Sequence, residues 1–276
     1  MTEHVGGQAV IEGVMMRKGN KIATAVRLRN KKIKTKKDRL KKRSKFWKIP
    51  FFRGMAELYS MLVMGMKTLL WSADQQLEKH EKITKWEIFY TLALSVGFAI
   101  VFFIVIPLFL AGLVIEKGFW FNLVDGIIRI IVFISYLYLI SLMKDVKVLF
   151  RYHGAEHKTV NCYEAGEKLT YENIKKYSTL HPRCGTAFIF IVLIISILMF
   201  SIIRAPEWYI RLGVRIVFIP MIAGISYEIL KLSDRFKNIF FIRWLTKPGL
   251  WLQKITTKEP NKKQIEVAVK ALKEVL

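Results

Sequence analysis

Four long apolar runs dominate the pattern of hydrophobic and polar positions along this chain. Polar or charged segments separate the runs, which cover Ile88–Val114, Phe119–Met143, Thr186–Ile203 and Ile210–Leu232. A helix needs about 20 apolar residues to cross a hydrocarbon core that is roughly 30 Å thick. The pattern therefore predicts an α-helical polytopic membrane protein with about four transmembrane helices, paired as one hairpin at residues 88–142 and a second at residues 186–232.

A different pattern, partial alternation of apolar and polar residues, marks the start of the chain. It covers Gln8–Met16 and returns over Lys21–Leu28, which predicts a small β-hairpin within residues 1–28. The turn falls at Lys18-Gly19-Asn20, because glycine and asparagine tolerate positive φ. Glu12 is the one acidic residue within the two strands. It is either an exposed strand residue or a contributor to a functional site.

Two further segments are amphipathic and have helical spacing. Apolar positions over Phe51–Trp71, in the part that spans residues 29–87, predict a helix that lies in the membrane interface or packs on the spans. Residues 233–276 predict an interfacial helix over Phe236–Leu252, broken at Lys247-Pro248-Gly249, and a final amphipathic helix over Asn261–Leu276 that docks on the polar part.

The distribution of charge sets the expected topology. The 276 residues are 53% hydrophobic yet carry a formal net charge of +24, a combination that is rare in soluble domains. Of the 45 lysines and arginines, 21 precede the first span, 8 lie in Met143–Gly185 and 11 in Lys231–Leu276. By the positive-inside rule, we expect both termini and the middle loop on the cytoplasmic side of the lipid bilayer.

A basic arm, Arg27–Lys48, carries far more positive charge than orientation alone requires. Asp38 is its one acidic residue, so the segment repels itself and is expected to be flexible unless it binds something. Its expected counterparts are anionic lipids, or RNA such as that of the ribosome, since both present phosphates. Positive-inside insertion explains part of the charge without any such partner.

The candidate chemistry gathers in the middle loop, residues 143–185. Five of the seven histidines and cysteines of the chain lie there, namely His153, His157, Cys162, His181 and Cys184. On one helix face, histidines four residues apart can bind one metal ion, and zinc is the divalent metal that this ligand set favours. A disulfide is not expected on the reducing, cytoplasmic side.

Two kinds of metal site fit this loop. In the H-x-x-E-H pattern the glutamate, here Glu156, acts as general base for a metal-bound water, and a further acidic ligand follows downstream. Glu164, Glu167, Glu172 and the distant Glu228 are the candidates for that ligand. The alternative is a closed structural site of two cysteines and two histidines. The plainest interpretation is a polar helix whose histidines are satisfied by ordinary hydrogen bonds.

Charged residues also occur inside the apolar runs. Asp125 and Arg129 lie four apart in the second run, and Arg211 and Arg215 lie in the fourth. Charge within a bilayer is usually paired and is a functional candidate by default. Here we weigh structural ion pairing, with Asp125 shared between Arg129 and Arg215, against a transport or lipid-related role. Pro107 and Pro220 predict kinks in the first and fourth runs.

Several long motifs resemble one family. They are VGGQAVIEGVMMR at Val5–Arg17, YHGAEHK at Tyr152–Lys158, HPRCGT at His181–Thr186 and PGLWLQ at Pro248–Gln253. Together they resemble the YqhQ-like family of bacterial membrane proteins, a family of unknown function that is sometimes labelled as metal-dependent enzymes. The resemblance covers nearly the whole chain. It implies a bacterial inner-membrane protein with a suspected metal site, and it supplies no demonstrated reaction.

Two hypotheses of function follow. The first is a metal-dependent, hydrolase-like enzyme at the cytoplasmic face, with His153 and His157 as ligands and Glu156 as general base or supporting group. His181, Cys184 or Cys162 would complete the site, and Glu12 is a candidate for contact with it. The second is a non-catalytic membrane accessory factor with a structural metal or polar site, whose basic arm binds RNA, a ribosome or anionic lipid. A transporter that uses Asp125, Arg129 and Arg215 is a weaker third.

Overall fold

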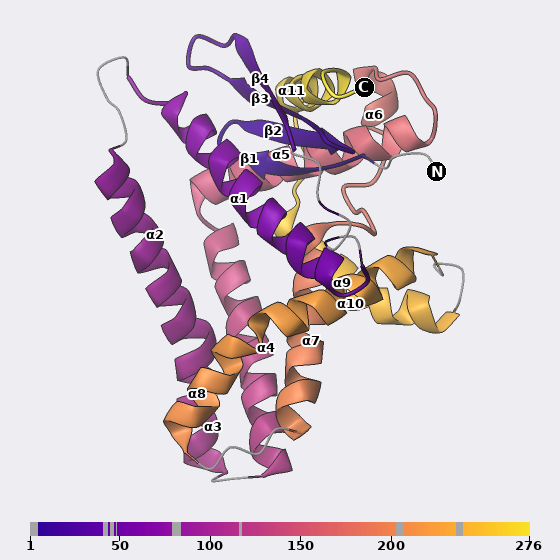
Figure 1. Ribbon diagram of the computed structural model, residues 1–276. Helices are drawn as coiled ribbons and strands as arrows, with labels where there is room; N and C mark the ends of the chain where they lie inside the picture. The colour runs from indigo at the N-terminus through magenta and orange to yellow at the C-terminus, as the bar shows by residue number, and fades with distance from the viewer. Residues whose placement is uncertain are drawn as a thin grey trace.

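The structure, a computed structural model, separates a polar layer from a set of long apolar helices. It describes all residues except 1–4, 41–43, 45–46, 48, 79–83, 116–117, 203–206 and 236–239. Figure 1 shows the polar layer, which consists of the N-terminal sheet and the helices packed on it, at one end, while the long apolar helices extend toward the other end. The helical class with β-structure at the start of the chain is therefore confirmed.

The β-structure is larger than the predicted hairpin. Four strands form an antiparallel meander in sequence order: β1 (Val5–Val10), β2 (Gly13–Lys18), β3 (Lys21–Arg27) and β4 (Ile33–Arg39). The turn at Gly19 is where we expected it, with φ of 58°. Gln8–Met16, however, is not one strand, because the chain reverses at Ile11-Glu12 and Val10 pairs with Gly13. Glu12 makes this reversal with φ of 51°.

The expectation of a flexible basic arm is wrong for its first part. Residues 33–39 form the edge strand β4, which pairs with β3 along its whole length. Acidic and amide groups of the protein meet several of its cations: Lys37 Nζ lies 2.6 Å from a Glu274 carboxylate oxygen, and Lys34 donates to Gln75. Most of residues 41–48 lies outside the described residues.

The sheet is covered on both faces, which places the core. One face packs on α5 (Lys144–Glu164) and α11 (Lys262–Lys273) through Val14, Met16 and Ala25. The other face packs on α1 (Phe52–Asp74), where Val10, Met15 and other residues meet Met64 and Trp71. Each large apolar side chain that is buried this way stabilises the fold by about 1.5–3 kcal/mol. The polar layer therefore holds α5 rigidly on one side of the sheet.

Two of the four predicted spans are single helices long and apolar enough to cross a membrane. The first is a 30-residue rod over Lys85–Val114, in which α2 (Lys85–Ile100), a π-helical turn (Val101–Val105) and α3 (Ile106–Val114) follow one another. The second is α4 (Phe119–Ser141). The π-helical turn directly precedes the segment that holds Pro107, where we predicted a kink.

The other two predicted spans are less regular. α8 (Trp208–Val217) and α9 (Ile219–Arg235) pass the same test only as a pair, bent by 45° next to Pro220. α7 (Gly185–Ile202) is a shorter apolar helix within the described residues. By length and composition, two or three segments of the described residues could thus cross a membrane, whereas we predicted four spans.

The helices that follow α9 differ from the prediction at one position. α10 (Phe240–Thr256) continues through Pro248, so the predicted break there is wrong. Gly249 lets α10 approach α7, since a side chain there would lie 2.8 Å from the Ala187 backbone. α11 begins at the Asn261 cap and packs on the sheet and α5, as its amphipathic pattern predicted. α6 (Tyr171–Ile174) is a single turn, capped by Thr170.

Candidate metal centre

Helix α5 carries the first two candidate ligands on one face. His153 and His157 lie one helical turn apart, and their ring centroids are 4.4 Å from each other. The His157 side chain is almost fully buried, and that of His153 is 15% exposed. The four-residue spacing in the sequence therefore correctly predicted that the two rings lie side by side on one helix face.

Backbone carbonyls fix the protonation pattern of both rings. His153 Nδ1 lies 2.9 Å from the carbonyl oxygen of Thr256, and His157 Nδ1 lies 2.5 Å from that of Thr179. A carbonyl oxygen can only accept, so each Nδ1 must carry the hydrogen. In the neutral rings, both Nε2 atoms are then unprotonated. That of His153 lies 3.2 Å from Cys184 Sγ, and the two lie 3.9 and 3.8 Å from a Glu156 carboxylate oxygen. Metal-binding histidines in proteins are typically anchored in this way.

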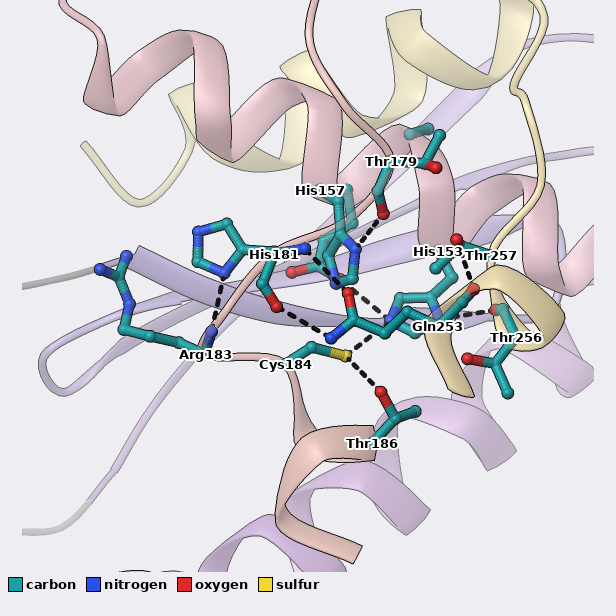
Figure 2. A network of polar contacts seen from close by, with 12 residues as sticks. His153, His157, Thr179, His181, Arg183, Cys184, Thr186, Gln253, Thr256 and Thr257 are labelled. Carbon is teal, nitrogen blue, oxygen red and sulfur yellow. Dashed lines mark hydrogen bonds and ion pairs between the residues drawn. The ribbon is translucent and has the colours of Figure 1, made fainter. Parts of the chain in front are cut away.

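Cys184 completes a group of three. It directly precedes α7, and its Sγ lies 3.2 Å from His153 Nε2. The Thr186 hydroxyl donates to the same sulfur over 3.3 Å. One ligand atom from each of His153, His157 and Cys184 lies within 4.8 Å of the other two. Figure 2 shows the sulfur between the Thr186 hydroxyl and the His153 ring.

Glu156 brings a carboxylate to the same place. Its Oε2 lies 3.9 Å from His153 Nε2 and 3.8 Å from His157 Nε2. Burial raises the pKa of this carboxyl, and the nearby His153 and His181 and the Gly7 backbone N–H partly offset that rise. A side chain at Gly7 would lie 2.3 Å from the Met15 carbonyl oxygen and 3.1 Å from Glu156 Cγ, so glycine suits the close packing of strand β1 at this point.

Gly154 allows the segment after α10 to cover the site. A side chain at residue 154 would lie 2.1 Å from the Lys258 carbonyl oxygen, a distance that no real contact has. Lys258 also donates its N–H to the Phe150 carbonyl over 2.9 Å. This close contact holds Thr256 against His153, so the glycine of the H-G-x-E-H run serves the position of the first histidine.

Side-chain amides hold the loop that carries the other anchors. Asn161 donates from its Nδ2 to the carbonyls of Ser178 and Leu180, on either side of Thr179. Gln253 of α10 accepts from the His181 N–H over 2.8 Å and donates to the His181 carbonyl over 2.9 Å. Gln253 is fully buried, so this two-bond clamp is shielded from water. Helices α5 and α10 thus position Thr179 and Cys184 together.

Two of the predicted ligands lie beside this group rather than in it. The His181 ring centroid is 5.7 Å from that of His157, its Nδ1 accepts from the Arg183 N–H, and its Nε2 lies 3.6 Å from Glu164. Figure 2 shows the ring on the Arg183 side of the loop. Cys162 is buried in the core of the polar layer, and its thiol contacts the Lys168 carbonyl.

Glu164 is an anchor for the same loop. It forms an ion pair with Arg183 and lies close to His181. Burial raises the pKa of the Glu164 carboxyl, but contact with His181 and the charge of Arg183 outweigh it, so the pKa lies below its ordinary value. This carboxylate therefore faces His181 and does not belong to the group of His153, His157 and Cys184.

Two other acidic candidates are engaged elsewhere. Glu12 accepts from the Tyr152 hydroxyl over 3.0 Å, and its charge together with burial raises the pKa of that tyrosine. It therefore contacts the neighbour of His153 in sequence. Glu228 pairs with Arg53 and accepts from the Phe51 N–H over 3.1 Å, which fixes the start of α1 on α9.

The charges within the apolar helices form one cluster. Asp125 Oδ2 accepts from Arg129 Nη2 over 3.0 Å and from Arg215 Nη1 over 2.6 Å. All three residues are buried, and the second ion pair joins α4 to α8. The shared carboxylate that we weighed as the structural alternative is thus the arrangement in the structure.

Sequence reasoning missed the groups that orient the ligands. Thr179 and Thr256 act through their backbone carbonyls, which every residue has, so no side-chain pattern could reveal them. Gln253 and Gly7 did lie within the motifs quoted above, but the motifs gave them no role. The polar Gln253 next to the apolar Leu252 was the one available signal.

Comparison with known proteins adds a family but no reaction. The family model described as "Protein of unknown function (DUF1385)" matches residues 49–276. The protein from Bacillus subtilis (strain 168) called "Uncharacterized protein YqhQ" is 34% identical over 292 residues, covering 98% of this chain and 92% of that protein. No solved structure matches significantly.

Proposed function

Since the chain belongs to the DUF1385 family of proteins of unknown function, we propose its role from the site itself: a membrane-bound, metal-dependent hydrolase. His153, His157 and Cys184 would hold one divalent cation, zinc by ligand type, and Glu156 would act as general base. The uncovered apolar helices support a location in the membrane, because Leu94 and Leu113, for example, are 76% and 68% exposed outside a bilayer.

The metal proposal rests on one observation: several groups that can accept a hydrogen bond or bind a cation meet at one place. Two imidazole lone pairs, a sulfur and a carboxylate face one another within a few ångströms. The thiol proton of Cys184 can satisfy one lone pair, on His153, and leaves that on His157. Acceptors that meet in a buried place repel unless a cation or proton lies between them. A divalent cation satisfies all of them at once.

The donor set fits zinc. Zinc is bound by histidine nitrogen and cysteine sulfur, and catalytic zinc sites commonly use three protein ligands and leave a fourth position open. Three ligand atoms meet here. The hydroxyl of Thr186 donates to the sulfur, and carbonyls of Thr179 and Thr256 hold the rings, so the supporting contacts of a metal site are present.

The chemistry would be divided between the cation and the carboxylate. When bound, a zinc ion lowers the pKa of water to about 7 and polarises a carbonyl or phosphoryl group. Glu156 would accept the proton, since burial raises the pKa of its carboxyl and makes it a stronger base than an exposed glutamate. Gly7 holds the carboxylate in place through its backbone N–H.

A closed, structural site is the alternative, and it belongs to the accessory-factor hypothesis. Glu156 would then be the fourth ligand, and the cation would only fix α5 to α7. We favour the open site because Glu156 Oε2, although 3.9 and 3.8 Å from the two imidazole Nε2 atoms, does not belong to the group of ligand atoms that includes that of Cys184. The basic arm gives the accessory-factor hypothesis little support, because several cations of β4 already contact groups of the protein.

Cobalt substitution tests the site with a matched pair of cysteine variants. We expect one Co²⁺ per chain, with a sulfur-to-cobalt charge-transfer band, in the wild type and in Cys162→Ser. Cys184→Ser should lose the band and bind at least about 100-fold more weakly, since changes outside the ligand shell alone weaken binding by about 10–100-fold. Equal binding by the two serine variants would contradict the assignment.

Glu156→Gln separates the open site from the closed one. We expect this variant to bind cobalt nearly as tightly as the wild type, and we expect added acetohydroxamate to change the cobalt spectrum of both. If Glu156→Gln weakened binding as much as Cys184→Ser does, and hydroxamate had no effect, the site would be structural and the hydrolase proposal would fail.

A further inference from the structure

We propose a second site, separate from the metal centre: an apolar cavity between α1 and the start of α9 that holds an acyl chain of an anionic membrane phospholipid. The cavity has a volume of about 720 Å³. Its lining includes Ala56, Tyr59 and Leu62 of α1, Ile219 and Pro220 of α9, and Trp47. No residue of its lining lies on α5, so the inference stands or falls independently of the metal.

A tight crossing of two helices lies beside the cavity and keeps it from closing. α1 and α9 meet at glycines: a side chain at Gly54 would lie 3.0 Å from the Gly224 carbonyl, and one at Gly224 would lie 3.0 Å from the Phe51 ring. The ion pair of Arg53 with Glu228 fixes the same crossing. The lining positions Ala56–Leu62 follow Gly54 along α1, and those of α9 precede Gly224. The space is therefore built into the way these helices cross.

The position and surroundings of the cavity point to a lipid. It lies where the apolar pair α8 and α9 bends by 45°, and its rim exposes Tyr59, Leu62 and Ile219 at 70%, 63% and 48%. A volume of about 720 Å³ falls within the range of roughly 300–1,000 Å³ that is typical of small-molecule sites. An acyl chain gains stabilisation with every methylene that enters such a space.

The charge around the cavity favours an anionic headgroup. Tyrosine and tryptophan gather at the headgroup level of membranes, and Tyr59 and Trp47 both line the cavity. Leu40 also lines it, and Arg39, its neighbour in the sequence, is exposed. Each such cation near an anionic membrane surface adds attraction. Glu57 of α1 does not oppose it, because it pairs with Arg17.

Photolabelling tests the site in the full-length protein. The probe is phosphatidylglycerol with a diazirine on one acyl chain, reconstituted with the protein in bilayers, and the labelled peptides are mapped by mass spectrometry. We expect labels on the peptides that contain residues 52–62 and 219–220. The variant Ala56→Phe, which fills the cavity, should lower this labelling at least about tenfold, the loss expected when two methylene groups no longer fit.

Three comparisons make the result decisive. Ala93→Phe adds the same ring to an exposed position of α2 and should leave labelling unchanged. Phosphatidylcholine with the same chain should label about fivefold less, as expected for one lost contact with a cation. Leu62→Phe fills the cavity from its exposed rim, so it can replace Ala56→Phe if that variant does not fold. Unchanged labelling in a folded filling variant, or equal labelling by the two lipids, would overturn the proposal.

Discussion

Two buried polar clusters of this protein differ in the kinds of group that meet in them. In the cluster of the apolar helices, the carboxylate of Asp125 lies between the guanidinium groups of Arg129 and Arg215. Charges of opposite sign meet there, and the contacts join α4 to α8. In the cluster of the polar layer, the groups of His153, His157, Cys184 and Glu156 meet, and the anchoring carbonyls leave the Nε2 atoms of both neutral imidazoles as acceptors.

The difference indicates which cluster requires something from outside. Opposite charges stabilise one another within the protein, so the ion pairs explain the Asp125 cluster without a ligand. Converging acceptors need a proton or a cation between them, and the anchoring of both imidazoles by carbonyls holds them in that arrangement. Perturbing each cluster should therefore change different properties: stability for the first, metal binding for the second.

The largest expected loss of stability comes from Asp125→Asn. The amide keeps the shape of the side chain but leaves two guanidinium groups buried without their counter-charge, which destabilises a protein by about 3–5 kcal/mol. Thermal unfolding in detergent should show a clearly lower midpoint, while cobalt binding per folded chain stays that of the wild type. If cobalt binding fell in proportion to stability, the two clusters would not be independent.

Gly154→Ala should act on both properties at once. Its new methyl group would lie 2.1 Å from the Lys258 carbonyl and push the segment of Thr256 away from His153. Overpacking of this kind destabilises by about 1–3 kcal/mol. We also expect weaker cobalt binding. The control is Gly97→Ala, since a side chain at residue 97 meets nothing within 4 Å. Equal cobalt affinity of the two variants would show that the segment does not position His153.

The smallest effect is expected from Glu164→Gln. The lowered pKa of this carboxyl means that its ionised form stabilises the folded protein, by about 1 kcal/mol or less because it is partly exposed. This stabilisation is present above the ordinary pKa of 4.5 and is lost as the pH falls through the lower value of the folded state. Unfolding midpoints of wild type and variant should differ at pH 7 and converge in acid. A constant difference at every pH would contradict this cause.

Local patterns predicted the parts of this structure that local physics decides. Helical spacing predicted the contact between His153 and His157, and the amphipathic stripe predicted α11. The turn at Gly19 followed from residue type. In each case a short stretch of side chains determines the structure without help from distant segments.

Long-range contacts decided what the patterns missed. The alternation of Gln8–Met16 fits one strand, and only pairing of Val10 with Gly13 shows the reversal at Glu12, which is not a glycine. β4 is basic and lacks the usual strand composition, yet β3 provides a partner along its length. α10 continues through Pro248, next to the close contact of Gly249 with α7. The carbonyls that orient the histidines leave no trace in the sequence.

Metal content of the purified full-length protein is the most direct test of the metal centre. The protein would be purified in detergent without chelators, and zinc and other metals would be measured per chain by plasma mass spectrometry. We expect close to one zinc per wild-type chain and almost none in the folded His153→Ala, His157→Ala double variant. A metal-free wild type that also fails to take up added zinc, or a double variant that keeps its metal, would contradict it.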